Sequence, residues 1–226
     1  MARARTDVSK RDDGLQSAYS GMVVETGHVW GPLDLVGGLP CLDFANTAGG
    51  HTKIREVERI PTYQDMINWA RYAQTLSGSE ARTALGLAKS KPQEAARQLH
   101  ETHVFREALH RSVSAIAGGR PIESQDFAHV RSIITKAVAI AEIAGRDEAF
   151  VWSVDAGAAG LGIVLSRMAL SAHDMLTREK PSQLRQCERC TWLFIDRTKN
   201  QKRRFCRQDA CGNKARAERF YNRHHG

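Results

Sequence analysis

The sequence predicts a mainly α fold of the α+β class, with a helical N-terminal domain that carries one β-hairpin and a small, treble-clef-like cysteine module after it. Three observations lead to this prediction. Apolar residues recur at helical spacing through most of residues 62–177. Two β-prone runs flank a turn at residues 145–147. Four of the five cysteines lie within residues 187–211.

The chain is predicted to have three parts. Residues 1–30 are polar and charged and lack the apolar region of a secretory signal, so we expect a flexible leader. Residues 31–180 form the helical domain and residues 181–226 the cysteine module. No run of about 18 apolar residues exists, so we expect no membrane contact and a cytoplasmic protein. In a reducing cytoplasm, clustered cysteines bind metals more often than they form disulfides.

Helix-start signals divide the helical domain. Thr62, with Asp65 three residues later, is a predicted N-cap, and Pro92 suits the first turn of a long helix that Gly118 ends. A second short helix is predicted from Ser79, a helix capped by Ser124 follows, and one continuous helix is predicted over residues 157–177. Between the last two, residues 137–155 predict a hairpin that lies on the helices.

Polar side chains in two apolar stretches are candidate ligand contacts. Asp43, Asn46 and Thr47 interrupt a buried-looking segment, where such residues either fix a turn or converge on a ligand, and the turn is favoured. Arg106 lies beside the buried stripe of the long helix. It could reach an interior carboxylate or an anionic ligand, although a salt bridge on the helix surface is the favoured role.

Enzymatic activity is not expected. His100, His103 and His110 lie at helical spacing, but no metalloprotease motif accompanies them, so we interpret them as ordinary, partly solvated side chains. The sequence also lacks the GxSxG, P-loop and dinucleotide-binding motifs and has no paired catalytic carboxylates.

The cysteine spacing C-x2-C-x15-C-x4-C predicts a structural zinc site with four thiolate ligands: Cys187, Cys190, Cys206 and Cys211. The competing redox interpretation of CxxC lacks its βαβ context. Residues 191–198 and 202–205 are predicted as the arms of a hairpin, and Asp209 as the cap of a helix that begins near Cys211. Such a small module folds around its metal, so we expect chelation to unfold only the last 40 residues.

Positive charge is concentrated at the C-terminus. Residues 187–226 contain 11 lysines and arginines against 4 acidic residues, and the whole chain contains 33 against 25. This asymmetry suggests a polyanion partner, nucleic acid before membrane, but charge alone does not decide between that partner and a solubilising tail. The arginines at helical spacing in the last helix favour contact with double-stranded DNA, with a protein-interaction finger as the alternative. Phe220 and Tyr221 are expected to pack back on the hairpin. The candidate DNA contacts within the finger are Lys199, Lys202, Arg203, Arg204, Asn213, Arg216, Arg219 and Arg223.

Two segments resemble known families. "CERCTWLFIDRTKNQKRRFCRQDACGNKARAERFYNR" resembles the CGNR zinc finger, with its four cysteines, Trp192, Phe194, Asp196 and Cys-Gly-Asn. "LVGGLPCLDFANT" and the helical body after it resemble the ABATE domain.

The resemblance implies a stress-responsive bacterial transcription regulator, associated with the nucleoid. Its finger would bind DNA and its helical domain would sense a small-molecule effector or form a homodimer. Asp43, Asn46 and Thr47, together with Arg106, then become candidate effector ligands. A zinc-finger adaptor that binds a protein, without sequence-specific DNA binding, remains the alternative.

The sequence departs from the CGNR motif at two positions. Lys214 stands in place of the final arginine of the motif, and Phe205 in place of the usual tryptophan before the third cysteine. Lysine keeps the charge but loses the planar fork, so specificity should change if Lys214 contacts a base, and little should change if it contacts a phosphate.

Overall fold

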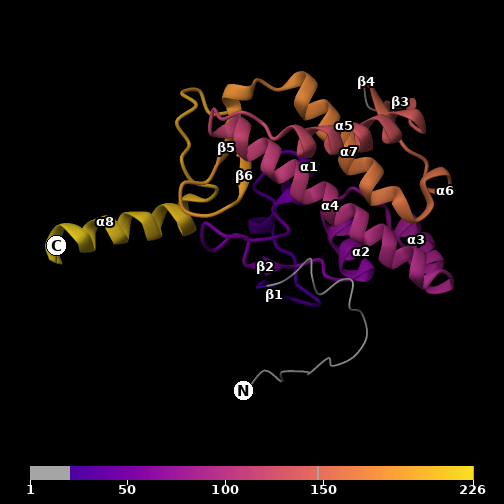
Figure 1. Cartoon of the computed structure of the whole chain (residues 1–226), viewed down its shortest axis with the longest axis horizontal. Coiled ribbons are helices and arrows are strands. Elements are labelled where there is room, and N and C mark those ends of the chain that lie inside the picture. Colours follow the sequence, from indigo (N-terminus) through magenta and orange to yellow (C-terminus); the bar gives the residue numbers. More distant parts are fainter. Residues whose placement is uncertain (1–20, 147, 226) are drawn as a thin grey trace, which may run out of the picture.

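The computed structural model describes residues 21–146 and 148–225. A helical body occupies most of the molecule, and the last helix, α8, stands away from it (Figure 1). The predicted fold class is confirmed: the N-terminal region is helical with a few short strands, and the C-terminal cysteines form a zinc-finger-like site. Of the predicted leader, residues 1–20 lie outside the described residues. Strand β1 (Val23–Val24) pairs in parallel with β2 (Val57–Glu58).

The elements follow one another in a simple order. The helices are α1 (Pro40–Ala45), α2 (Tyr63–Tyr72), α3 (Gly78–Ser90), α4 (Pro92–Ala117), α5 (Ser124–Ala139), α6 (Ala156–Ala159), α7 (Ile163–Arg178) and α8 (Asn213–His225). Short 3₁₀ turns are η1 (Pro32–Asp34), η2 (Gly160–Gly162) and η3 (Pro181–Gln183), and η4 (Gln208–Gly212) is a π-helical turn. The remaining strands are β3 (Glu142–Arg146), β4 (Ala149–Ser153), β5 (Leu184–Gln186) and β6 (Leu193–Ile195).

Most predicted helix starts are confirmed to within a residue or two. The Thr62 side chain accepts a hydrogen bond from the Asp65 amide at 3.1 Å, and Pro92 is the first residue of α4. Helix α3 begins at Gly78, one residue before the predicted start, with Ser77 as its N-cap. A capping box between Ser77 and Glu80 therefore fixes this start, because each side chain bonds the backbone of the other residue.

Two details of the helix prediction are wrong. Glu123, not Ser124, is the N-cap of α5, and Ser124 is already helical. The single helix predicted over residues 157–177 is broken at Gly160, whose φ of 53° lies in the left-handed region. An α-helix cannot continue through that conformation, so α6, η2 and α7 replace one helix.

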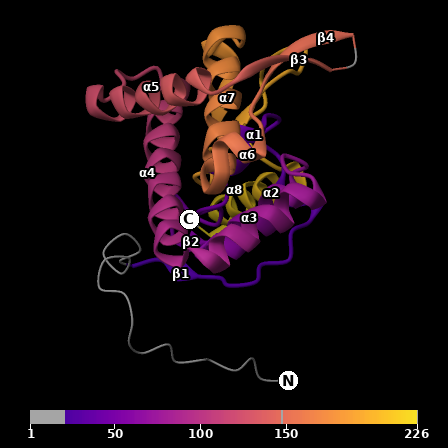
Figure 2. The same ribbon diagram turned by 90° about the vertical axis from the view of Figure 1, so that its right-hand side faces the viewer.

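The predicted hairpin is confirmed. Strands β3 and β4 are antiparallel, and Ile143 lies opposite Trp152. Trp152 packs partly against the core, whereas Ile143 and Phe150 are exposed. Figure 2 shows the hairpin reaching beyond the helices, so it covers them only in part.

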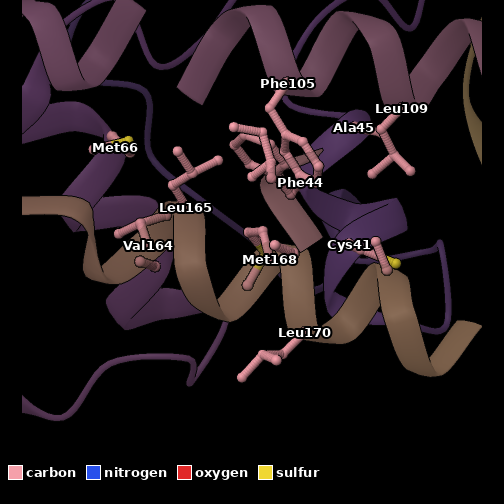
Figure 3. Close-up of a cluster of buried hydrophobic side chains, with 14 of the residues drawn as sticks. Cys41, Phe44, Ala45, Met66, Phe105, Leu109, Val164, Leu165, Met168 and Leu170 are labelled. Atoms are coloured by element: carbon pink, nitrogen blue, oxygen red, sulfur yellow. The ribbon is translucent and has the colours of Figure 1, made fainter. Parts of the chain in front are cut away.

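The core is built around α1. This six-residue helix is too short to be stable alone, and its buried side chains hold it between α4 and α7 (Figure 3). Phe44 is fully buried, and its ring lies 5.4 Å from that of Trp69. Phe105 from α4 and Met168 from α7 close the cluster, and both are fully buried. The end of α1 is therefore fixed firmly in the body.

A buried ion pair joins α4 to β2. The guanidinium of Arg106 donates to both carboxylate oxygens of Glu58, and its Nη1 also donates to Thr47 Oγ1 at 3.0 Å. Arg106 and Glu58 are both buried. Burial raises the pKa of Glu58, but the charge and hydrogen bonds of Arg106 outweigh this effect and hold that pKa below its usual value. Arg106 thus binds an interior carboxylate, and the favoured interpretation as a helix-surface salt bridge is wrong.

We predict that Arg106→Ala lowers the free energy of unfolding by about 3–5 kcal/mol, because it leaves the Glu58 carboxylate buried without its partner. Arg111→Ala is the matched control on the same helix, since it removes an exposed pair with Asp126 and should cost less than about 1 kcal/mol. Urea denaturation followed by circular dichroism measures both. Equal losses in the two variants would contradict the stabilising role of the buried pair.

Candidate metal centre and nucleic-acid-binding surface

Four cysteine sulfurs meet at one point of the finger. The ligand atoms of Cys187, Cys190, Cys206 and Cys211 all lie within 4.8 Å of one another, and all four residues are buried. The Cys206 sulfur lies 3.7 Å from those of Cys190 and Cys211. A tetrahedron with zinc–sulfur bonds of about 2.3 Å has edges of about 3.8 Å. The donor set and its spacing therefore fit a structural Zn²⁺, as predicted.

The finger backbone shapes this site. A knuckle connects β5 to β6, and it is closed by a hydrogen bond from the Cys187 amide to the Trp192 carbonyl at 2.9 Å. Hydrogen bonds from Cys190 and Cys206 lower the pKa of Cys187, and the bond with Cys187 raises the pKa of Cys190 to about 12. Zinc displaces the thiol protons when it binds. Four thiolates complete the tetrahedron, so the ion has a structural role and no open position for catalysis.

The predicted hairpin between residues 191–198 and 202–205 is wrong. Strand β6 pairs with β5 instead, and residues 202–205 are not a strand. Buried Asp196 organises the loop that follows β6 by accepting from the amides of Thr198 at 3.0 Å and Arg203 at 2.8 Å. The Asp196 carboxylate thus accepts the hydrogen bonds that the backbone carbonyls of a second strand would have accepted.

Aromatic side chains pack around the cysteines. Trp192, Phe194 and Phe205 are buried with them. Phe205, which replaces the tryptophan of the motif, fills its place in this small core. Arg203 stacks over the Phe194 ring at 4.3 Å and donates to the carbonyls of Phe205 and Cys206. The Arg203 guanidinium therefore holds the finger together.

The start of the last helix differs from the prediction. Asp209 does not cap it: Arg207 occupies the N-cap position of η4, and Asp209 pairs with that arginine at 2.8 Å. Cys211 lies in η4, and α8 begins two residues later at Asn213, whose side-chain amide donates to the Asp209 carbonyl at 3.2 Å. The π-helical turn carries the fourth ligand directly into α8.

Most predicted DNA-contacting side chains are exposed on the finger. Arg204 is engaged by Glu188 through two hydrogen bonds, and Arg203 is held as described above. The predicted packing of Phe220 and Tyr221 on the hairpin is wrong, because both side chains are more than half exposed. The exposed candidates without an acidic partner among the described side chains are Lys199, Lys202, Asn213, Lys214, Arg216, Arg219 and Arg223.

The finger is docked on the body by hydrogen bonds to its backbone. The Asn46 side-chain amide donates to the Leu193 carbonyl and accepts from the Leu193 amide, each at 2.8 Å. Lys53 Nζ donates to the Cys187 carbonyl at 2.6 Å, and Nε2 of His110 lies 2.8 Å from the Thr191 carbonyl. Nothing in the sequence pattern pointed to Lys53 or His110, because both partners are main-chain atoms more than 80 residues away.

The four candidate effector ligands have partners within the chain. Asp43 accepts from the Gly37 amide at 2.7 Å, which supports the turn interpretation, and burial raises its pKa to about 6. Thr47 donates to the Phe44 carbonyl at 2.8 Å and accepts from Arg106. Asn46 holds Leu193. An effector at this place would have to displace these bonds.

The interpretation of the α4 histidines as partly solvated is wrong for two of them. His103 and His110 are buried, and Nε2 of His103 lies 3.1 Å from the Ile60 carbonyl. Burial lowers the pKa of His103 to about 4 and that of His110 to about 3, so both are neutral. His100 is exposed.

The two buried histidines predict acid sensitivity. Their pKa values are lower in the folded chain than the unfolded value of about 6.5, so they stabilise the fold above pH 6.5. That stability should be lost as the pH falls from about 6.5 towards 4, by up to about 1.4 kcal/mol per pH unit for each histidine. Urea denaturation at pH 7 and pH 5 measures the loss. His103→Gln with His110→Gln should reduce it, His100→Gln should not, and an unchanged loss in the double variant would contradict this origin.

Metal removal should affect both parts of the chain. Zinc should bind at one ion per chain, and chelation should unfold the finger and also lower the melting temperature of the body by several degrees, since Lys53 and His110 lose their acceptors. The interface thus revises the expectation that only the last 40 residues unfold. Metal analysis should show loss of zinc in Cys206→Ser and retention in Cys41→Ser, a buried cysteine outside the cluster. Full zinc in Cys206→Ser would contradict the assignment.

Comparisons with protein families agree with this architecture. The model of the ABATE family, described as "Putative stress-induced transcription regulator", matches residues 38–179. The model of the CGNR zinc finger matches residues 183–224 and includes all four cysteine ligands. No curated protein matches the chain.

Neither of the two family descriptions names an enzyme. Within residues 21–146 and 148–225, no helix is both long and apolar enough to cross a membrane. The ABATE match spans more than half of the chain, and the finger match follows it directly. The chain therefore belongs to the ABATE family and carries a C-terminal CGNR zinc finger.

Proposed function

We propose that this protein is a DNA-binding transcriptional regulator whose finger contacts double-stranded DNA. The observation that carries the proposal is the basic face of α8, which we define as Arg216, Arg219 and Arg223. These side chains are exposed on a helix that stands away from the body (Figure 1). The metal ligand Cys211 lies one turn before this face and fixes where the helix starts.

The arginines of the basic face are available to a polyanion. They line one shallow groove together with Asn222, so they gather on the same side of α8. Within the part of the chain that the structure describes, no carboxylate forms an ion pair with any of them. Their remaining bonds are to carbonyls of their own helix, from Arg219 to Ala215 and from Arg223 to Arg219. Arginine suits phosphate groups and guanine edges through its planar fork.

Exposed lysines extend this surface. Lys199 and Lys202 lie in the loop after β6, and Lys214 opens α8 next to Asn213. Arg203 and Arg204 contribute less in this proposal, because their guanidinium groups are already engaged within the finger. The loop lysines would add phosphate contacts that position the finger, and α8 would supply the contacts to bases.

The helical domain would regulate the finger. We propose that it senses a small-molecule effector, forms a homodimer, or does both, in a protein of the bacterial cytoplasm that associates with the nucleoid. In a dimer, two fingers would bind two half-sites, and their spacing would follow from the dimer geometry. The direct bonds from Asn46 and Lys53 to the finger give the body a mechanical connection to α8.

A protein-interaction adaptor is the second candidate. Phe220 is 58 % exposed and Tyr221 is 63 % exposed on α8. Exposed aromatic side chains beside arginine are typical of the centres of protein interfaces. In this case nucleic-acid affinity would be weak and indifferent to sequence.

Charge reversal on the basic face should weaken DNA binding. Genome-wide capture of bound DNA provides the duplex, and fluorescence anisotropy over a range of salt concentrations measures its affinity. Arg216→Glu with Arg219→Glu should lower the affinity at least about tenfold and reduce the slope of log K against log salt by about 2, because each neutralised phosphate contributes about 0.9.

The control must carry the same change of net charge. Lys89→Glu with Arg97→Glu alters two exposed residues on α3 and α4, far in sequence from the finger. This variant should keep most of the affinity and the salt slope. If both double variants bind the duplex equally, the basic face of α8 is not the DNA contact. Sequence-indifferent binding by the unaltered protein would favour the adaptor.

A further inference from the structure

A cavity of about 320 Å³ lies where the body meets the finger. Its walls come from the segment that ends with η1, from the loop after α1, from Arg59 after β2 and from the finger, including the metal ligands Cys206 and Cys211 and the start of α8. This volume falls in the range of small-molecule sites, about 300–1,000 Å³. Glu25, Asp34, Arg59, Arg189, Trp192 and Lys214 are among its lining residues.

Three polar atoms of residues that line this cavity, one of them Nε2 of His28, are buried without a hydrogen-bond partner, and the other two are N–H donors. The indole Nε1 of Trp192 has no hydrogen-bond partner, and Trp192 is only 7 % exposed. The Nε of Arg189 is likewise buried and without a hydrogen bond. A buried donor without an acceptor destabilises the fold, so two at one cavity indicate a missing acceptor. Gly50 also lines the cavity, and a Cβ there would lie 2.5 Å from Trp192 Nε1, so a side chain at this position would clash with the indole.

The charges of the cavity specify what would fill it. Lys214 has no acidic partner among the described side chains, and Arg59 stacks over the Trp192 ring at 5.8 Å. The acidic groups already have partners, because Glu25 lies 3.4 Å from Arg59 Nε and Asp34 accepts from the Gly31 amide at 2.8 Å. The uncommitted groups are therefore donors and a cation, which together call for an oxyanion.

We propose that this cavity binds a small molecule that carries a carboxylate or phosphate group. Its oxygens accept hydrogen bonds from Trp192 Nε1 and Arg189 Nε and pair with the ammonium of Lys214. Lys214, where the sequence departs from the CGNR motif, would then serve to bind this ligand. The compact ammonium of a lysine pairs with a single oxygen, whereas the guanidinium of an arginine would present a larger, forked group.

The ligand would contact both the body and α8. Arg189 donates to the His51 carbonyl of the body at 3.2 Å and to Glu218 of α8. A bound oxyanion that accepts from Arg189 and pairs with Lys214 would therefore change the contacts that hold α8. This regulatory consequence rests on the proposed function, whereas the binding itself does not.

A larger cavity does not offer the same chemistry. About 610 Å³ lies between the β3–β4 hairpin and the start of α3. Its charged groups are already paired, since Arg167 donates to Glu80 and to the carbonyls of Thr75 and Val154. No polar atom of that arginine is left buried without a partner in the described structure.

Indole resonances test the proposal without DNA. The zinc-loaded full chain, labelled with ¹⁵N, has four tryptophans, and Trp192→Phe assigns the Trp192 indole signal by its loss. Sodium phosphate and, separately, sodium acetate are titrated at constant ionic strength against chloride. The Trp192 indole signal should shift saturably with at least one of these anions. Lys214→Gln should weaken that binding about tenfold, as expected for a charge-assisted hydrogen bond.

Lys89→Gln is the matched control, because it removes the same charge from an exposed position on α3. Its anion affinity should equal that of the unaltered chain. The proposal is overturned if neither anion shifts the Trp192 indole signal more than chloride does, or if Lys214→Gln and Lys89→Gln bind alike. It is also overturned if duplex DNA moves this signal and neither phosphate nor acetate does, since the phosphate bound there would then belong to DNA. None of these outcomes depends on the basic face of α8.

Discussion

The placement of the finger depends on one side-chain amide. Asn46 forms the C-cap of α1, which the core surrounds, and its amide pairs with both main-chain groups of Leu193 at 2.8 Å. This pairing imitates a neighbouring strand and satisfies two buried backbone groups of β6 that would otherwise lack partners. From Leu193 the chain leads back through the knuckle to Cys190. Asn46 therefore connects the packing of α1 to the finger, beside the bonds that Lys53 and His110 form.

Metal and body consequently stabilise the finger together. Zinc supplies the local folding free energy that so small a segment cannot obtain from its own core. Lys53 and His110 bind carbonyls of the segment that carries the metal ligands. The body therefore gains these hydrogen bonds when the knuckle is ordered. Only α8 extends beyond this shared structure (Figure 1). The contacts between body and finger therefore fix where α8 begins, and under the proposed function they would set the angle at which that helix meets DNA.

Local patterns predicted the parts of the structure that local forces determine. The Thr62 cap is one example, since capping involves residues close in sequence. The cysteine spacing is another, since the geometry of the metal determines which spacings can supply its four ligands. The β6 pairing and the role of Arg106 were missed, because they depend on partners that only the folded chain brings near. Glu58 lies 48 residues from Arg106, and no periodicity reports such a pair. Hydrogen bonds to the Asp196 carboxylate likewise take the place of a predicted strand, and the strand propensities of the residues do not report such side-chain bonds.

Native-state hydrogen exchange tests most directly whether the finger and the body form one unit. In the zinc-loaded protein, the account predicts that the Leu193 and Ile195 amides exchange with the same opening free energy as amides of α4 around Phe105 and Leu109. Asn46→Ala should lower the protection of the two finger amides first. Fast exchange of Leu193 and Ile195 in the unaltered chain, with α4 fully protected, would show that the finger opens independently and would contradict the account.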